Sequence, residues 1–321
     1  MLGDLWKGLG GKLADRWLAA LFSPAFAFWL GGFATWLYAY GASAVAREGW
    51  VGALKRWTAG VQGLPVVAQG LLVVGPLLLV TLFGLLLQQM SWPVLRLMEG
   101  YWPRPLDPPR ERLRARLSSR TDRLLPRLRE LSARPAAQLS AGELAERGRL
   151  ARRYQSVPPV PAQRMPTRLG NVLRAAELRS SSRYGLDAVT CWPRLWLLLP
   201  EAVRQEVVTA RSALYLAIQV WILGVVFPIW SFWAWWAAPL GLFIAVLTYY
   251  GRILPAARIY GDLILSCYDV HRGLIYSALR WPLPAHPAEE IRFGKRISAY
   301  LTAGSREESP AFTTTEHSST T

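Results

Sequence analysis

The chain has 321 residues and a formal net charge of +16, and it combines 52% hydrophobic with only 18% charged residues. Soluble globular proteins carry about 25% charged residues, so this balance argues against an ordinary soluble protein of two domains. The two cysteines, Cys191 and Cys267, are too few and too far apart in sequence for a disulfide framework or a zinc knuckle.

The charge is distributed unevenly along the chain. Residues 96–211 hold 23 arginines and 11 acidic residues, and therefore supply three quarters of the net charge. Only four of the 37 basic residues are lysines. This bias toward arginine, together with abundant Ala, Gly, Leu and Pro, indicates a GC-rich genome and hence a bacterium.

A short N-terminal segment, 1–16, is expected to be amphipathic. Beyond it, three long runs contain no charged residue: 17–46, 57–95 and 212–251. A helix needs about 20 apolar residues to cross a bilayer, so the first two runs each predict one transmembrane helix, centred on 20–40 and 66–90. Together they form a first hairpin over 17–95. The first run is too long for the apolar part of a cleaved signal peptide.

The third uncharged run is long enough for two helices and predicts a second hairpin over 212–251. Pro228 and Pro239 bracket its tip, and the tryptophans of 230–236 are expected to anchor that tip at the membrane interface. No ionisable side chain lies inside any predicted span, which argues against a proton-coupled pump. Close helix packing is expected at the glycines of the spans, which are Gly31, Gly32, Gly70 and Gly75.

The distribution of basic residues predicts the orientation of the chain. With four spans, the N-terminus, residues 96–211 and the C-terminal region share one side of the membrane and carry 34 of the 37 basic residues. Basic loops stay in the cytoplasm, so that side is expected to be cytoplasmic. Arg47, Lys55 and Arg56 in the first outer loop are the discordant feature.

The basic segment 96–211 is expected to form an α-helical cytoplasmic domain. Leucines at roughly helical spacing, with arginines between them, predict a basic amphipathic helix that is interrupted near Pro126. Ser140 and Glu143 have the spacing of a capping box for a second helix reaching Arg153, and the prolines of 157–161 predict an extended linker. Such a basic surface is solvated, paired within the protein, or bound to anionic lipid or an acidic partner; nucleic acid is the least favoured ligand.

Residues 167–200 are the least generic part of the chain. Thr167 is expected to cap a helix, and the apolar stretch 188–200, which contains Arg194, is too short to span a membrane. This stretch either packs under the cytoplasmic domain or dips into the headgroups. The block and the helix after it, residues 167–220, resemble uncharacterised multi-span membrane proteins of GC-rich bacteria. The resemblance implies a membrane location and brings no activity or site residues.

From Pro200 a continuous helix is expected to run through Glu201 into the third uncharged run. Residues 252–303 predict cytoplasmic amphipathic helices, of which the first runs to Arg280, and residues 304–321 predict a disordered tail. The expected apolar face of the first helix is Ile259, Leu263, Cys267, Val270 and Leu274. Charged residues on the opposite side are expected to form ion pairs within the helix, and these residues are Arg258, Asp262, Asp269 and Arg272.

No catalytic, cofactor-binding or metal-ligating residues are predicted. Asp269 and His271 near Cys267 point in different directions on one helix, and His286 with Glu289 lacks further ligands. No phosphate-binding loop, dinucleotide fingerprint or nucleophile elbow occurs in the sequence.

The sequence thus predicts an all-α, polytopic helical membrane protein with four transmembrane helices in two hairpins and an arginine-rich cytoplasmic domain. We expect a multi-pass protein of the cell membrane, with both termini in the cytoplasm, that acts as a non-enzymatic interaction or scaffold protein. Its basic domain would contact anionic lipid headgroups or an acidic cytoplasmic protein. The alternative is a homo-oligomeric channel or transport component, and a third hypothesis is a lipid-modifying enzyme that uses Asp262 and Asp269.

Overall fold

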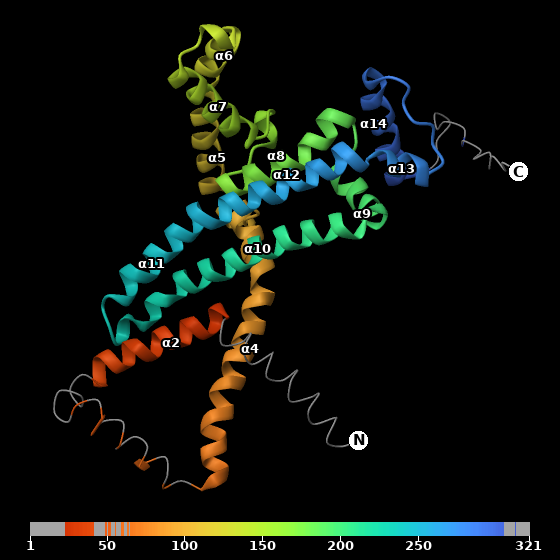
Figure 1. Ribbon diagram of the computed structural model, residues 1–321. Coiled ribbons are helices and arrows are strands. Elements are labelled where there is room, and N and C mark those ends of the chain that lie inside the picture. Colours follow the sequence, from red (N-terminus) through yellow and green to blue (C-terminus); the bar gives the residue numbers. More distant parts are fainter. Residues whose placement is uncertain are drawn as a thin grey trace, which may run out of the picture. The chain divides into compact units, whose positions relative to one another are not determined.

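The computed structural model describes residues 23–41 and 65–304, along with residues 49, 51, 52, 55, 59, 60, 63 and 312. The expected N-terminal segment 1–16 lies outside the described residues, as does the expected tail apart from Gly304 and Phe312. The described residues form helices and turns without any strand (Figure 1). Their α-helices are α2 (Pro24–Trp36), α4 (Val66–Glu99), α5 (Asp107–Asp122), α6 (Leu125–Ala133), α7 (Ala141–Gln155), α8 (Arg168–Tyr184), α9 (Ala188–Leu198), α10 (Glu201–Val226), α11 (Ala237–Thr248), α12 (Leu254–His271), α13 (Gly273–Ala278) and α14 (Pro287–Ala303).

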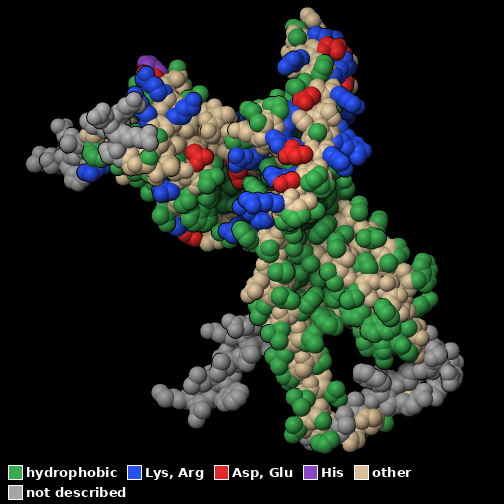
Figure 2. All heavy atoms as spheres, turned by 180° about the vertical axis from the view of Figure 1, so that it is seen from behind, with side chains coloured by type: hydrophobic (Ala, Val, Ile, Leu, Met, Phe, Trp, Pro, Cys, Tyr) green, Lys and Arg blue, Asp and Glu red, His purple; other side chains and the backbone are tan. Residues whose placement is uncertain are grey.

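The chain divides into two compact units. Unit 1 contains the chain up to Leu95 together with Tyr215–Arg252, and unit 2 contains Arg96–Leu214 and the chain from Ile253 onward. These breaks lie close to the changes from uncharged to charged sequence. Figure 2 shows basic side chains gathered on unit 2 and hydrophobic side chains over much of α4.

Among the described residues, three helical stretches are long and apolar enough to cross a membrane. They lie in Val67–Ala133, Glu201–Phe232 and Ala237–His271, and they give the protein the character of a helical membrane protein. The last two meet around a short turn of 3₁₀-helix, Phe227–Phe232, inside the third uncharged run. The first predicted span is represented by α2 and the π-helical Leu37–Gly41, which are not among the three.

Unit 1 is held together by aromatic packing. The rings of Phe28 on α2 and Phe83 on α4 stack with their centroids 5.4 Å apart, and Trp230 approaches Phe28 at the same distance. A Cβ atom at Gly32 would lie 2.5 Å from the indole of Trp230, so this glycine makes room for the ring, as expected of a packing glycine. Gly70 and Gly75, by contrast, face open space.

The tip of the hairpin combines exposed and packed aromatic side chains. Phe232 and Trp235 are 96% and 75% exposed, which suits residues at a membrane interface. Trp230 instead packs against α2 and stacks on Trp233, with ring centroids 5.3 Å apart. Only part of the tip is therefore available as an anchor.

Helix α4 satisfies two of its hydroxyl groups within the helix itself. Thr81 donates its hydroxyl proton to the carbonyl of Leu77, and Ser91 donates to that of Leu87, both at 2.8 Å. Back-bonding of this kind lets hydroxyl side chains lie at membrane depth. Most of the apolar side chains of α4 are exposed, as a lipid-facing helix requires.

Unit 2 is built around a hydrophobic core shared by α8, α9, α10, α12, α13 and α14. Cys191, Leu195 and Leu199 are buried there, and Trp192 and Trp196 pack against them. One face of the apolar stretch 188–200 therefore packs within unit 2, whereas Val189 and Leu197 are 68% and 76% exposed. Helix α10 begins directly after Pro200 and continues unbroken to Val226, as the sequence predicted.

The expected apolar face of the C-terminal helix is only partly correct. Cys267 is buried and Leu263 packs against the core, but other members of the predicted face are exposed. Ile259 and Val270 are 58% and 73% exposed, whereas the buried face of α12 includes Ala257, Gly261 and Leu265. The helix also ends at His271 and is followed by the separate helix α13, so it does not run unbroken to Arg280. Small residues let α12 lie against α8 (Figure 1), and a hydrophobicity pattern underestimates such residues.

The ion pairs of α12 also differ from expectation, because they join helices instead of forming within one. Asp262 pairs with Arg179 at 2.9 Å, and Asp269 pairs with Arg183 at 3.5 Å. The guanidinium of Arg272 pairs with a glutamate of α14, Glu290. Charged residues at helical spacing can thus connect neighbouring helices as well as successive turns.

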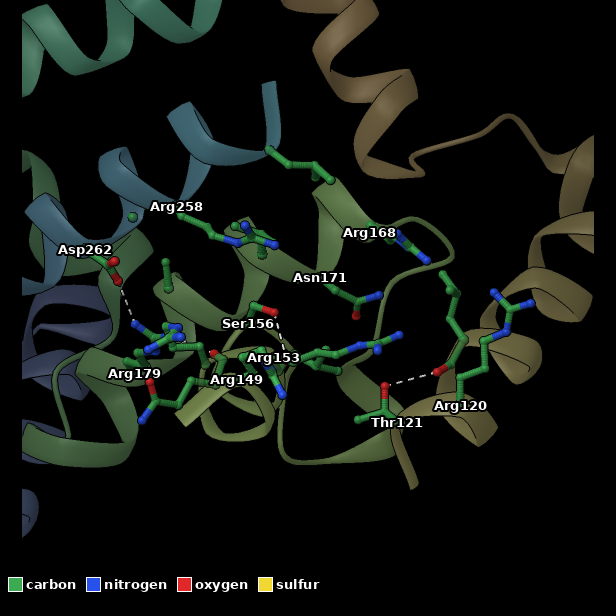
Figure 3. Close-up of a pocket in the computed structure, with 18 residues that line it drawn as sticks. Arg120, Thr121, Arg149, Arg153, Ser156, Arg168, Asn171, Arg179, Arg258 and Asp262 are labelled. Atoms are coloured by element: carbon green, nitrogen blue, oxygen red, sulfur yellow. Dashed lines mark hydrogen bonds and ion pairs between the residues drawn. The ribbon is translucent and has the colours of Figure 1, made fainter. Parts of the chain in front are cut away.

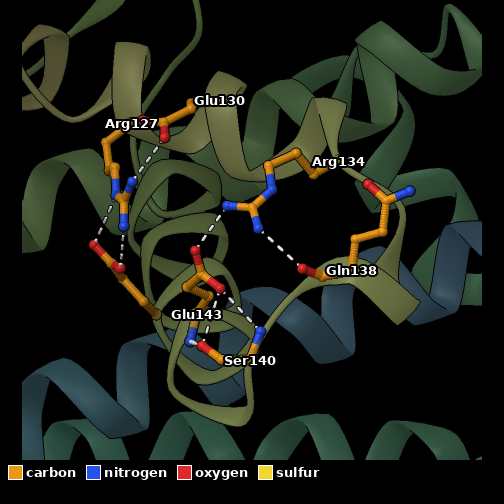
Figure 4. A network of polar contacts seen from close by, with 7 residues as sticks. Arg127, Glu130, Arg134, Gln138, Ser140 and Glu143 are labelled. Atoms are coloured by element: carbon orange, nitrogen blue, oxygen red, sulfur yellow. Dashed lines mark hydrogen bonds and ion pairs between the residues drawn. The ribbon is translucent and has the colours of Figure 1, made fainter.

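Helices α5, α6 and α7 form the basic arm of unit 2, and this arm follows the local sequence signals closely. Helix α5 ends at Asp122, and Pro126 lies in the first turn of α6, where proline is tolerated, so the predicted interruption is confirmed. The predicted capping box of α7 is present as well: Ser140 N–H donates to Glu143 Oε2 at 2.9 Å, and Glu143 N–H donates to Ser140 Oγ at 3.3 Å. Arg134 donates to Glu143 Oε1 at 2.7 Å (Figure 4).

This capping network should make α7 sensitive to acid. The Ser140 N–H and hydroxyl, followed by Arg134, lower the pKa of Glu143 to about 2 from an ordinary value of 4.5. Because the folded pKa lies below the unfolded one, the stabilisation is complete above pH 4.5 and is lost as the pH falls toward 2. Hydrogen exchange of α7 amides should therefore accelerate over this range after correction for intrinsic rates. Glu143→Gln should remove most of that dependence, and an unchanged profile would contradict the assignment.

Helix α14 docks closely onto the end of α8. Helix α8 ends at Gly185, whose φ of +72° places it in the left-handed region. A Cβ atom at Gly294 of α14 would overlap the carbonyl oxygen of Tyr184. Ser298 accepts a hydrogen bond from Asp187 N–H at 2.9 Å and completes the contact.

Candidate functional site

Unit 2 contains a cavity of about 570 Å³ whose lining is rich in arginine. Its walls come from α5, α7, the segment after α7, α8 and α12 (Figure 3). Seven of the lining residues are arginines, namely Arg120, Arg149, Arg152, Arg153, Arg168, Arg179 and Arg258. The one acidic residue of the lining is Asp262.

Two features of local folding bring these arginines together. Arg149, Arg152 and Arg153 recur at the spacing of one helical face on α7, so they point to the same side. Thr167 caps α8 by accepting a hydrogen bond from Gly170 N–H at 2.9 Å, which places Arg168 in the first turn.

A buried arginine outside the cavity fastens α5 to the segment after α7. The side chain of Arg164 is 3% exposed; it donates to Asp122 Oδ1 at 2.9 Å and to the carbonyl of Pro158 at 3.3 Å. A further bond from Arg164 reaches the carbonyl of Ser118 at 3.4 Å. Arg164 therefore holds in place two of the segments that line the cavity.

Most of the cavity's charge is not neutralised within the described part of the chain. Arg179 is engaged, because it pairs with Asp262 at 2.9 Å and donates to the carbonyl of Gln155 at 2.6 Å. Within the described ranges, no ion pair or side-chain hydrogen bond is formed by five of the others, Arg120, Arg149, Arg152, Arg153 and Arg258. All five are exposed. The cavity thus presents several guanidinium groups that are open to a ligand.

The floor of the cavity is apolar and its uncharged polar groups are mostly occupied. Val172, Ala176 and Leu254 are buried there. Thr121 donates to the carbonyl of Leu117 at 3.1 Å, and Asn171 donates to the carbonyls of Met165 and Thr167, both at 2.8 Å. Recognition in this cavity therefore depends on the charge of the arginines.

The acidic and cysteine residues considered from the sequence do not form a reactive cluster in the described structure. Asp269 accepts a hydrogen bond from the Tyr184 hydroxyl at 2.5 Å, and burial followed by this bond raises the pKa of Tyr184. Cys267 is buried in the core, and Glu289 pairs with Arg292 at 3.5 Å. Within the described residues, no group of three or more His, Cys, Asp or Glu side chains could hold a metal ion.

Sequence reasoning predicted a basic domain but missed the cavity. The only local signal was the spacing of Arg149, Arg152 and Arg153, whereas Arg120 and Arg258 join them through tertiary packing. Asp262, which had been considered as a catalytic group, lies in this cavity as the partner of Arg179.

Comparison of the chain with protein-family models, with curated proteins and with solved structures gives no match. The resemblance of residues 167–220 to membrane proteins of GC-rich bacteria stays an expectation.

Proposed function

We propose that the protein is a non-enzymatic, membrane-anchored interaction protein. Its apolar helices hold unit 2 at the cytoplasmic face of the cell membrane, where the basic cavity receives an anionic group from a lipid or an acidic partner. The observation that carries this proposal is the cavity itself, in which seven arginines face one acidic residue. Arginine stays charged at physiological pH, so such a concentration favours an anionic partner.

The chain connectivity supports the membrane anchoring of unit 2. The chain passes between the units at three points, inside α4, inside α10 and in the π-helical Tyr249–Ile253 before α12. All three points lie in helical stretches that are apolar enough to cross a membrane. Each basic residue near an anionic membrane surface contributes about 1 kcal/mol of attraction. Unit 2 is therefore tethered where anionic headgroups are concentrated.

We assign the fourth crossing of the proposed topology to the first uncharged run. Helix α2 and the π-helical turn after it cover residues 24–41, and the uncharged run begins at residue 17. A span needs about 17 to 25 residues, which this run supplies. Four crossings place both termini and unit 2 on the same side.

Labelling of single introduced cysteines tests this topology. Ser231 lies in the hairpin tip and Ser132 lies near the end of α6, and both are exposed. In intact cells, a membrane-impermeant maleimide should modify Ser231→Cys and spare Ser132→Cys until the membrane is opened. The two native cysteines are buried, so the unmodified protein supplies the background. Modification of position 132 alone would refute the cytoplasmic placement of unit 2.

A homo-oligomeric channel or transport component is the second candidate, and one observation favours it. Leu71, Leu78, Leu82 and Leu85 of α4 are all more than half exposed, and Gly75 beside them has open space. Such a surface could contact further copies of the chain as readily as lipid. Flux through reconstituted vesicles distinguishes the candidates: conductance favours the channel, and zero flux of common ions and solutes with co-purification of a stoichiometric partner favours the interaction protein.

A further inference from the structure

We propose that the arginine cavity of unit 2 is a binding site for a phosphate group carried on a small aliphatic stem. This assignment rests on the proposed function and names the chemistry of the ligand. Both a phospholipid headgroup and a soluble phosphate ester carry this group, and the test below separates the two sources.

Unbalanced charge is the first argument for an anionic ligand. Arg120, Arg153 and Arg258 line one cavity yet come from three different helices, α5, α7 and α12. No acidic side chain of the described part of the chain pairs with any of them. Guanidinium groups keep their charge, so their mutual repulsion is relieved only by a bound anion or by solvent and salt.

The geometry of the lining favours phosphate over other anions. Figure 3 shows Arg120 on one side of the cavity and Arg179 and Arg258 toward the other, with Arg153 between them. Guanidinium groups bind phosphate through two parallel N–H bonds, and a tetrahedral phosphate can accept such pairs from several directions at once. A planar carboxylate accepts fewer of them. A volume of about 570 Å³ also lies within the range of small-ligand sites, about 300 to 1,000 Å³.

The floor of the cavity restricts the remainder of the ligand. Val172, Ala176 and Leu254 offer only apolar contact, and the polar side chains of Thr121 and Asn171 are engaged in bonds within the protein. A nucleobase or a sugar would lose hydrogen bonds to water there without regaining them. An aliphatic stem has no hydrogen bonds to water and therefore loses none.

The test uses the full-length protein purified in detergent and two variants that remove equal charge. The cavity variant replaces one arginine on each of three helices: Arg120→Ala, Arg153→Ala and Arg258→Ala. The surface variant replaces three exposed arginines outside the cavity lining: Arg112→Ala, Arg116→Ala and Arg129→Ala. Circular dichroism should show the same helix content in both variants, because these side chains are exposed.

Two probes report on the two sources of phosphate. Inorganic pyrophosphate is titrated by calorimetry, and phosphatidylglycerol is compared with phosphatidylcholine by native mass spectrometry of protein equilibrated in mixed micelles. The cavity variant should bind the responding probe about 100-fold more weakly, and the surface variant should stay within about threefold of the parent. Lysine at the same three cavity positions should give an intermediate loss of affinity of about tenfold. Lysine keeps the positive charge but lacks the paired N–H donors of the planar guanidinium group.

Each outcome decides the proposal. If the cavity variant alone loses binding of phosphatidylglycerol, the ligand is a lipid headgroup. If it alone loses binding of pyrophosphate, the ligand is a soluble phosphate compound. Equal losses of probe binding in the cavity and surface variants would refute the assignment of the cavity as the site. Such a result would still be consistent with lipid contact by the surface of unit 2. Binding of neither probe by the parent protein would also overturn the site, and the cysteine labelling at positions 132 and 231 would still decide the proposed function separately.

Discussion

Replacement of Gly294 by alanine is expected to lower the free energy of unfolding of unit 2 by about 2 to 3 kcal/mol. The added methyl group would overlap the carbonyl oxygen of Tyr184 and would lie 2.9 Å from its carbonyl carbon. Both atoms belong to the backbone, so a side-chain rotation cannot relieve the contact and α14 must move away from α8. Hydrogen exchange of the α8 and α14 amides in detergent should show the loss as faster global opening.

The matched control for Gly294 is Gly148, which lies in the middle of α7. There the nearest neighbour of an added Cβ atom is the flexible end of Arg152 at 3.6 Å, an ordinary contact. Alanine has a higher helix propensity than glycine by roughly 1 kcal/mol, so Gly148→Ala should slow exchange in α7. Similar effects of the two substitutions would contradict the close approach of α14 to α8.

Loss of the Arg164 side chain should destabilise the basic arm by about 3 kcal/mol. Arg164→Ala removes a buried cation that bonds Asp122 and the carbonyls of Ser118 and Pro158, and it leaves the carbonyl of the buried Pro158 without its partner. Exchange should accelerate in α5 and in the segment after α7, because these bonds hold the two together. Protection in the core of α9 should change less.

Arg116→Ala supplies the control for Arg164→Ala. Arg116 lies on α5 and is exposed, and such surface substitutions usually change stability by less than about 0.5 kcal/mol. If both alanine variants exchanged at the parent rate, Arg164 would not tie the segments together. A lysine at position 164 should recover only part of the stability, because it keeps the charge but has no planar fork.

Local signals predicted much of unit 2 correctly. The capping box at Ser140, the cap at Thr167, the interruption near Pro126 and the start of α10 after Pro200 are all present. Each depends on residues within one helical turn, so the chain alone determines them. The all-helical fold and its long apolar helices follow for the same reason, since length and composition act along the sequence.

Features that depend on contacts between distant segments were not predicted correctly. On α12 the face with the larger apolar residues Ile259 and Val270 remains exposed, because Ala257 and Gly261 allow closer approach to α8. Small residues such as alanine and glycine give only a weak signal in the periodic pattern of hydrophobic residues along a sequence. The same reason explains the missed cavity, whose arginines come from segments far apart in the chain.

The burial of Cys191 gives the protein a native reporter of its own opening. Burial raises the pKa of this thiol, so little reactive thiolate forms at neutral pH, and the side chain is fully enclosed by the core. A thiol reagent can reach it only while unit 2 is transiently open. The rate of alkylation at this position therefore measures how often the core of unit 2 separates inside an intact membrane, without any substitution in the chain.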